Sequence, residues 1–324
     1  LYGTFLLRPL LRGVGMLRAR AVLVSVILIV AMVEADRLTT LSEDQLYSDD
    51  IIYTTTSAYQ RILITQGRAG FQLFLNGNLQ FSSADEYRYH ESLVHPAMAA
   101  AARPPRRVLI LGGGDGLALR EVLKYPGIEQ VTLVDLDPKM TGLSRTFAPL
   151  GRLNGQSLRD RRVRIVNEDA FVWIEKERDR FDAAIIDFPD PNSFALGKLY
   201  TTRFYRLLRA RLTPDAAISV QCTSPLFARQ SDWCIIRTME AAGWSVRPYQ
   251  TTVPSFGVWG FALARMQPFA APAHVAVPVR YLDDATLGAM FVFARDMGSV
   301  PVEVNRLDNQ MLVRYYEEEW RRWS

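Results

Sequence analysis

The chain has 324 residues, of which 49% are apolar and 22% are charged, and these near-average values indicate an ordered protein that can hold one full α/β domain and a smaller unit. The net charge is +4 and the basic residues are not arranged in a stripe, so nucleic-acid binding is not expected. Two cysteines suggest a reducing compartment, and three histidines without metal-ligand spacing predict no metal site.

The N-terminal part contains an uncharged apolar run at Ala21–Val33. This run is shorter than the roughly 20 residues that cross a bilayer. Extending it toward Val14 brings in Arg18 and Arg20, whose side chains can reach the membrane interface. Arginines before the run also favour a cytoplasmic N-terminal side, which would leave the rest of the chain outside. A buried helix and a membrane span therefore both stay open, and the leading Leu is consistent with a fragment of a longer chain.

A polar linker at Glu34–Asp50 precedes a segment rich in Ile, Tyr, Thr and Phe. Within that segment, Asn-Gly at 76–77 separates the strand-like runs Phe71–Leu75 and Asn78–Phe81, which is a strong hairpin signal. We predict a small antiparallel β unit here. A helix is predicted over Glu86–Ala101, ended by the prolines that follow it.

A buried parallel strand is predicted at 107–111, where Arg-Val-Leu-Ile-Leu runs into Gly-Gly-Gly-Asp-Gly and then into the helical spacing of Leu117–Lys124. Glycines such as Gly112 and Gly114 let the backbone approach a ligand closely, and the helix start offers free N–H groups. The next strand, Val131–Asp137, contains Asp135, which lies at the distance expected of a carboxylate that binds ribose hydroxyls. The pair predicts a nucleoside-binding site.

Asp115 limits which kind of nucleoside the predicted site can bind. An acidic side chain inside the loop would repel a pyrophosphate, so a cationic nucleoside such as a sulfonium is favoured over a dinucleotide. The alternative is that Asp115 only caps the following helix, because Asp is a good N-cap residue.

Further acidic residues follow later strands. Asp169 comes after the strand Val163–Val166 and opens the helix Ala170–Lys176, which it can also cap. Asp187 ends the strand Phe181–Asp187, although the Asp-Phe-Pro-Asp-Pro sequence that it starts could be a plain turn. Alternation of strands and helices continues to about residue 264 and predicts a doubly wound, mostly parallel α/β sheet with its site at the carboxyl ends of the strands. Several carboxylates on one rim need a cation or hydroxyl donors.

The tail has two helix-like stretches, Asp284–Arg295 and Gln310–Arg322. They are amphipathic and the tail is rich in Tyr and Trp. We interpret the tail as an appended lid or packing element and assign no catalytic residue to it.

Three motifs occur in order: Tyr-Arg-Tyr-His-Glu at 87–91, the glycine loop at 112–116 and Ile-Asp-Phe-Pro-Asp-Pro at 186–191. With these three motifs in this order, the chain resembles the spermidine synthase (polyamine aminopropyltransferase) family, and especially bacterial members with an N-terminal membrane region. The resemblance runs from about Tyr53 to Phe261. It implies a Rossmann-like, methyltransferase-type sheet preceded by a small β unit. We divide the chain into an apolar, membrane-type segment (1–38), a β-hairpin domain with a linking helix (39–104) and a catalytic domain with a helical tail (105–324).

The resemblance implies transfer of an aminopropyl group from decarboxylated S-adenosylmethionine to putrescine, giving spermidine and methylthioadenosine, with no metal and no other cofactor. By this parallel Asp187 is the base that takes a proton from the amine, and Asp190 binds the ammonium group of the acceptor. Asp115 pairs with the primary amine of the donor and repels the carboxylate of ordinary S-adenosylmethionine. Besides these, the resemblance assigns Tyr89, His90 and Gln60 to substrate binding and Gly112, Gly114, Asp135, Asp169 and Gln80 to binding of the adenosyl co-substrate.

The chain departs from the family pattern at Phe188, Pro189, His90 and Phe256, and this leaves the acceptor less securely defined than the donor. Two alternatives stay open: a methyltransferase or lyase that uses S-adenosylmethionine on the same fold, and a non-catalytic ligand-binding module. We also expect a homo-oligomer. The location expected is the cell membrane with a cytoplasmic catalytic domain, or else the cytoplasm.

Overall fold

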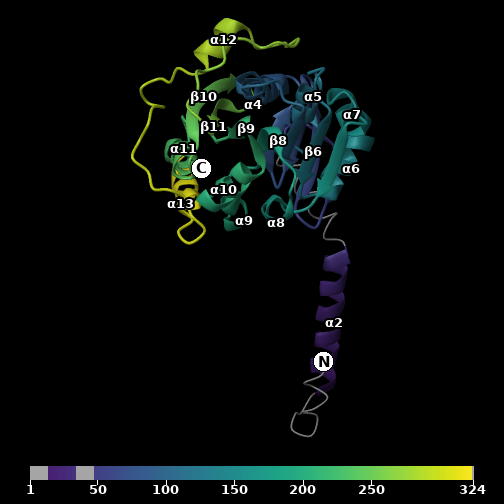
Figure 1. Ribbon diagram of the computed structural model, residues 1–324. Helices are drawn as coiled ribbons and strands as arrows, with labels where there is room; N and C mark the ends of the chain where they lie inside the picture. The colour runs from purple at the N-terminus through teal and green to yellow at the C-terminus, as the bar shows by residue number, and fades with distance from the viewer. Residues whose placement is uncertain (1–13, 34–46, 323–324) are drawn as a thin grey trace.

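A computed structural model describes residues 14–33 and 47–322 (Figure 1). The predicted linker falls mostly on 34–46, and with it the boundary proposed at 38/39 lies outside the described residues. The rest forms a small antiparallel sheet followed by a larger α/β unit. This arrangement confirms the fold class predicted from the sequence.

The small sheet has four strands in the order β1-β2-β3-β4, all antiparallel. The predicted hairpin joins β3 to β4, and its turn residues Asn76 and Gly77 have φ of 50° and 81°, as a tight hairpin turn of this kind requires. The strands are β1 (Asp50–Thr56), β2 (Arg61–Gly67), β3 (Gly70–Leu75) and β4 (Asn78–Ser82).

The large sheet has seven strands in the order β10-β11-β9-β8-β5-β6-β7. From β9 to β7 neighbouring strands are parallel, whereas β10 and β11 form an antiparallel hairpin at one edge. The strands are β5 (Arg107–Gly112), β6 (Gln130–Asp135), β7 (Val163–Asn167), β8 (Phe181–Asp187), β9 (Leu212–Gln221), β10 (Ser245–Val253) and β11 (Gly257–Arg265). The regular strand–helix alternation therefore stops after β10, because β11 follows it without a helix between them.

Helices cover both faces of the large sheet (Figure 1). Along β5, Leu109 and Leu111 enter one apolar cluster with α8, α10, α11 and α13, while Val108 and Ile110 enter a second cluster with α4 and α5. This alternation explains the continuous apolar run of β5, because both of its faces are buried. The helices of the body are α4 (Glu86–Ala100), α5 (Leu117–Leu123), α6 (Pro138–Thr146), α7 (Ala148–Leu153), α8 (Ala170–Lys176), α9 (Phe194–Gly197), α10 (Thr202–Ala210), α11 (Arg229–Ala241), α12 (Asp284–Ala289) and α13 (Met311–Trp320), with short 3₁₀ turns η1 (Ser157–Arg159) and η2 (Lys198–Tyr200).

Three α-helices, α7, α9 and α10, were not predicted, and one helix was predicted too long. α10 has a buried face of Phe204, Tyr205 and Leu208, and arginines lie between these residues in the sequence. The first tail helix ends at Ala289 rather than at Arg295. α7 and α9 are six and four residues long, which is too short for a helical period to show in the sequence.

The apolar N-terminal run forms α2 (Val14–Val33). Within the described ranges, α2 is the one helix long and apolar enough to cross a membrane, judged by length and composition alone. Its stretch Gly15–Met32 is not buried in the protein. The alternative of a buried core helix therefore finds no support in this structure.

The sharp turn after β5 generates a stability prediction. Gly112 has a φ of 81°, and an added Cβ would collide with the backbone carbonyl of Asp187 on the neighbouring strand. We expect Gly112→Ala to lower the free energy of unfolding by about 2 to 5 kcal/mol, since it combines backbone strain with a steric clash. Denaturant unfolding followed by tryptophan fluorescence measures this change. Gly127→Ala is the matched control, because a Cβ there meets nothing within 4 Å; equal losses in both variants would contradict the prediction.

Candidate active site

The carboxyl ends of β5, β6 and β8 bring the glycine loop and two acidic residues to one edge of the sheet. Gly112 lies in register with Asp187 on β8, and Asp135 ends β6 on the other side of β5. The backbone N–H of Gly114 donates to Asp135 Oδ2 at 3.0 Å, so the loop and this carboxylate are joined directly. Burial raises the pKa of Asp135 to about 6. The residues predicted to bind a nucleoside thus lie together at the ends of adjacent strands, and their role stays a prediction.

Asp115 has both of the features considered from the sequence. Its Oδ1 accepts a hydrogen bond from the backbone N–H of Leu117 at 2.8 Å, at the start of α5. The same side chain is half-buried and close enough to His90 and Glu86 to interact with them electrostatically, and burial raises the pKa of its carboxyl. Capping the helix and facing the rim are therefore compatible roles.

Tyr89 and Asp187 form a direct pair. α4 carries Tyr89, whose hydroxyl donates to Asp187 Oδ1 at 2.7 Å across 98 residues of sequence. Burial raises the pKa of Asp187 to about 6, and the nearby Asp115 carboxylate adds to the rise, while His90 and the Tyr89 hydrogen bond oppose it. A carboxyl with this pKa is mainly ionised at neutral pH and can still accept a proton, which suits a general base.

The buried side chain of His90 carries a positive charge and lies close to the Asp115 and Asp187 carboxylates. His90 Nδ1 lies 2.9 Å from Glu86 Oε2 and 2.8 Å from the Glu86 carbonyl oxygen, so Nδ1 carries a proton, because both partners are acceptors. Glu86 is held in turn by both terminal nitrogens of Arg120 at 2.8 and 3.0 Å. Burial alone would lower the pKa of His90, but the bond to Glu86 and the Asp115 and Asp187 charges raise it to about 9. At neutral pH the imidazolium thus partly offsets the acidic rim.

Asp190 lies in the loop after β8 and is held from two directions. Gln221, at the end of β9, donates from Nε2 to Asp190 Oδ1 at 3.3 Å. Tyr316, on the C-terminal helix α13, donates from its hydroxyl to Asp190 Oδ2 at 2.8 Å. The Trp259 indole fixes Gln221 from its other side by donating to Oε1 at 3.1 Å. Burial raises the pKa of Asp190, and the two hydrogen bonds oppose this rise.

The remaining predicted residues lie around this centre. Gln60, just before β2, donates to Asp137 Oδ2 at 3.0 Å and so links the small sheet to the end of β6. Asp169 caps α8 by accepting from the Phe171 N–H at 2.8 Å, and it also forms an ion pair with Lys198. Gln80 is half-buried on β4, where its amide donates to Asn78 of the same strand.

Sequence reasoning missed several residues of this region. Asp137 was visible two positions after Asp135, and Gln221 ends a predicted strand, so position at a strand end could have marked both. Trp259 and Tyr316 carried no such signal, because their role depends on how distant segments pack. The tail, which we interpreted as an appended lid or packing element, contacts Asp190 directly through α13.

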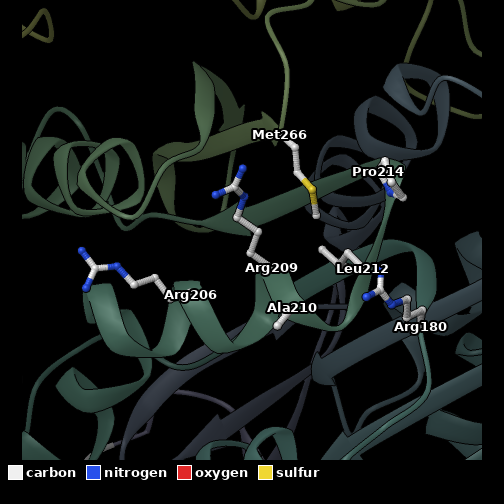
Figure 2. A pocket seen from close by; sticks show the side chains of 7 residues that line it. All are labelled: Arg180, Arg206, Arg209, Ala210, Leu212, Pro214 and Met266. Carbon is white, nitrogen blue, oxygen red and sulfur yellow. The ribbon is translucent and has the colours of Figure 1, made fainter.

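A surface cavity at the opposite end of the strands is lined by positively charged side chains, in contrast to the carboxylates of the candidate site. A cavity of about 360 Å³ lies at the amino ends of β8 and β9, where Arg180, Arg206 and Arg209 line it with Leu212 and Met266. Figure 2 shows the three guanidinium groups pointing in different directions. A hollow lined by cations does not suit a cationic ligand, and it lies at the end of the sheet away from the carboxylates.

Comparison with known proteins decides the family. Residues 86–271 match the spermine/spermidine synthase domain. The chain belongs to this family. The matched segment contains the glycine loop, the Tyr89–Asp187 pair and Asp190, but not Tyr316.

Among curated relatives of this family, a polyamine aminopropyltransferase of Leptospira interrogans is 48% identical over 322 residues, covering 99% of this chain and 64% of that protein. Polyamine aminopropyltransferase 2 of Ralstonia nicotianae is 50% identical over 308 residues, covering 94% of this chain and 60% of that protein. The chain thus spans a little under two thirds of the length of these relatives.

Solved structures of the family show the same fold. A spermidine synthase in complex with the transition-state analogue AdoDATO has a TM-score of 0.69 and 28% identity, and the match covers 76% of this chain and 86% of that one. The spermidine synthase of Thermotoga maritima also has a TM-score of 0.69, with 27% identity and coverage of 76% and 85%.

The buried ion network generates a second prediction. We expect Glu86→Gln to lower the free energy of unfolding by about 3 kcal/mol at pH 7, because it leaves the buried His90 charge without its carboxylate partner and removes one of the two carboxylates that pair with Arg120. The folded pKa of His90 lies above its ordinary value of 6.5. Its contribution to stability is therefore full below pH 6.5 and is lost as the pH rises through about 9.

Denaturant unfolding between pH 6 and pH 10 measures this effect, and the gap between the protein and Glu86→Gln should narrow as the pH rises. Glu129→Gln is the control, because Glu129 pairs with Arg106 at the exposed surface and should matter by less than about 1 kcal/mol. A gap that widens toward pH 10 would show that His90 is not held as a cation.

Proposed function

We propose that the protein is a polyamine aminopropyltransferase that moves the aminopropyl group of decarboxylated S-adenosylmethionine to putrescine, giving spermidine and methylthioadenosine. The observation that supports this most is the half-buried Asp187, bonded by Tyr89 and followed three residues later by a second carboxylate, Asp190. Two carboxylates in this order suit a reaction that must both hold an ammonium ion and remove a proton from it. The names of the relatives and the analogue-bound neighbour support the same activity.

The donor is proposed to lie over the glycine loop. Asp135 can accept the ribose hydroxyls at the end of β6, with Gly112 and Gly114 allowing close approach of the backbone. Asp115 can pair with the primary amine of the donor, and its charge would repel the carboxylate of ordinary S-adenosylmethionine. Asp169, after β7, would accept from the adenine amino group once it shares or gives up its contact with Lys198.

The acceptor amine is proposed to lie between Asp187 and Asp190. Asp190 holds the distal ammonium group, while Asp187 takes a proton from the ammonium group that will react. The freed nitrogen lone pair then forms a bond to the aminopropyl carbon attached to sulfur. The carbon–sulfur bond breaks at the same time, its electron pair returns to sulfur, and neutral methylthioadenosine leaves. The proton on Asp187 passes to solvent.

Tyr89 and His90 both favour the ionised form of Asp187, and Tyr89 also fixes its orientation. The Tyr89 hydroxyl fixes one oxygen of Asp187, which leaves Oδ2 for the amine. The His90 imidazolium favours the ionised form of Asp187, so the carboxylate is present at neutral pH despite its burial. Phe256 packs near Tyr89, with ring centroids 6.4 Å apart, and adds an apolar wall where the family pattern has a tyrosine.

The proposed activity predicts that the purified protein converts decarboxylated S-adenosylmethionine and putrescine into methylthioadenosine. Asp187→Asn should lower kcat by about 10² to 10⁴-fold, because it removes the base. In the unaltered protein, kcat/KM should fall as the pH drops through about 6, since protonated Asp187 cannot accept the proton. Chromatographic measurement of methylthioadenosine between pH 5 and pH 9 checks both expectations.

Asp179→Asn is the matched control for this experiment, because Asp179 forms an exposed ion pair with Arg107 near the other end of β8. It should leave kcat within twofold. Methylthioadenosine formation that persists in Asp187→Asn would remove Asp187 from the mechanism. A methylated product formed from ordinary S-adenosylmethionine, with no aminopropyl transfer, would overturn the proposed function.

We also propose that α2 holds the protein at the cell membrane with its catalytic body in the cytoplasm; assembly into a homo-oligomer stays a prediction. The support for a membrane anchor is the unburied apolar stretch Gly15–Met32. We expect the chain to sediment with membranes and to resist extraction with alkaline carbonate, since burying such a stretch in lipid is strongly favourable. The same chain with Leu23 and Ile27 changed to Asp is the control, and recovery of the unaltered chain in the soluble fraction would contradict the anchor.

A further inference from the structure

The C-terminal helix reaches the proposed amine site. Tyr316 on α13 donates its hydroxyl hydrogen bond to Asp190 Oδ2 at 2.8 Å, although the two residues are 126 positions apart. Tyr316 also lies beyond residues 86–271, the segment that matches the family domain. The contact is therefore an addition to the family's core site rather than part of the motif that identified it.

The position of α13 is fixed by buried contacts. Glu319, which is 5% exposed, accepts from the backbone N–H groups of Gln230 and Ser231 at 2.7 and 3.0 Å, and from the Ser231 hydroxyl at 2.8 Å. These donors belong to the first turn of α11, where a carboxylate is favoured by the helix dipole. Tyr316 lies one helical turn before Glu319 on the same helix. Its hydroxyl is thus held over Asp190 by an anchored element.

The loop before α13 is anchored as well. Asn305 is fully buried, and its Nδ2 donates to the carbonyl oxygens of Gly197 and Tyr200 at 3.0 and 3.2 Å. The Asn305 Oδ1 accepts from the backbone N–H of Leu312 in the first turn of α13. Tyr200 in turn donates to the carbonyl of Pro189, the residue before Asp190. The tail and the Asp187–Asp190 loop therefore form one connected set of contacts.

The hydrogen bonds on Asp190 determine which of its lone pairs an amine can use. Tyr316 occupies one position on Oδ2, and Gln221 approaches Oδ1. A carboxylate has about four acceptor positions, so two remain for an ammonium group. Both bonds also favour the ionised form of a carboxyl whose burial disfavours it. Loss of the Tyr316 hydroxyl would free the carboxylate to rotate and would make its ionised form less favourable.

We propose that Tyr316 is a positioning residue for amine recognition, which fixes the orientation and charge of Asp190 from a helix outside the family domain. This proposal rests on the proposed function, because it takes Asp190 as the group that binds the acceptor. Its rival is a purely structural role, in which the Tyr316–Asp190 bond only fastens α13 to the body.

Tyr316→Phe tests the proposal, since it removes the hydroxyl and keeps the ring, which lies 5.8 Å from that of Trp320. We expect the KM for putrescine to rise about 10-fold, the value for loss of a hydrogen bond to a charged group. The KM for decarboxylated S-adenosylmethionine and kcat should change by less than twofold. The acid limb of kcat/KM for putrescine should move to higher pH, because the pKa of Asp190 is no longer lowered by this bond.

Tyr315→Phe is the matched control. Tyr315 is the preceding residue on α13, and its hydroxyl accepts from the backbone N–H of Glu303 at 3.2 Å, away from Asp190. It should lower stability by a similar small amount without changing the KM for putrescine or the pH profile. If both variants raise that KM equally, or if Tyr316→Phe changes neither the KM nor the acid limb, the positioning role is wrong.

Titration calorimetry with putrescine, in the presence of methylthioadenosine, keeps this test separate from the proposed reaction. A protein that forms no methylthioadenosine but binds putrescine about 10-fold more weakly as Tyr316→Phe would refute the proposed activity and support the role of Tyr316. Equal binding by the protein and the variant would refute that role, whatever the turnover.

Discussion

The structure depends on withdrawing several carboxylates from water at one edge of a parallel sheet. Asp115, Asp135, Asp187 and Asp190 are each desolvated enough to raise the pKa of the carboxyl. Each is partly compensated by donors, from the Gly114 N–H to the Tyr89 and Tyr316 hydroxyls. The compensation is incomplete, and this is what makes the edge attractive to a cation. A sulfonium or an ammonium group entering it would supply the missing charge.

The network of Glu86, His90 and Arg120 limits how much uncompensated negative charge lies at this edge of the sheet. The imidazolium lowers the pKa values of Asp115 and Asp187, which burial raises, and so favours their ionised forms. For Asp187 this leaves a pKa of about 6, close to the pH at which a base works best. Arg120 further connects the network to the body, because it also donates to the Leu153 carbonyl and to Glu121. The stability of the fold and the charge of the site therefore depend on the same few side chains.

The sequence predicted much of the fold because its signals are local. Buried strands such as β5 and β8 are short apolar runs, and Asn76-Gly77 marks a hairpin by turn chemistry alone. The carboxylates at strand ends were likewise found, because in a parallel sheet the end of a strand predicts its place in space. The family resemblance assigned roles to them that spacing alone could not.

What the sequence could not predict depends on contacts between distant segments. Lys198 meets Asp169 across 29 residues, and the indole of Trp259 meets Gln221 across 38. The sequence did not show that β10 and β11 form an antiparallel hairpin, because the apolar pattern of a strand is the same whether it runs parallel or antiparallel to its neighbour. Local sequence patterns also did not define where the N-terminal segment ends and the β unit begins.

The reach of α13 has a consequence for how the protein is made. Every strand of the large sheet is complete by Arg265, and Tyr316 follows 51 residues later. During translation the glycine loop, Asp135 and Asp187 can thus be brought together while Asp190 still lacks the hydrogen bond from Tyr316. The hydrogen bond to Asp190 forms only after α13 has left the ribosome and docked, so this edge of the sheet is completed in two steps.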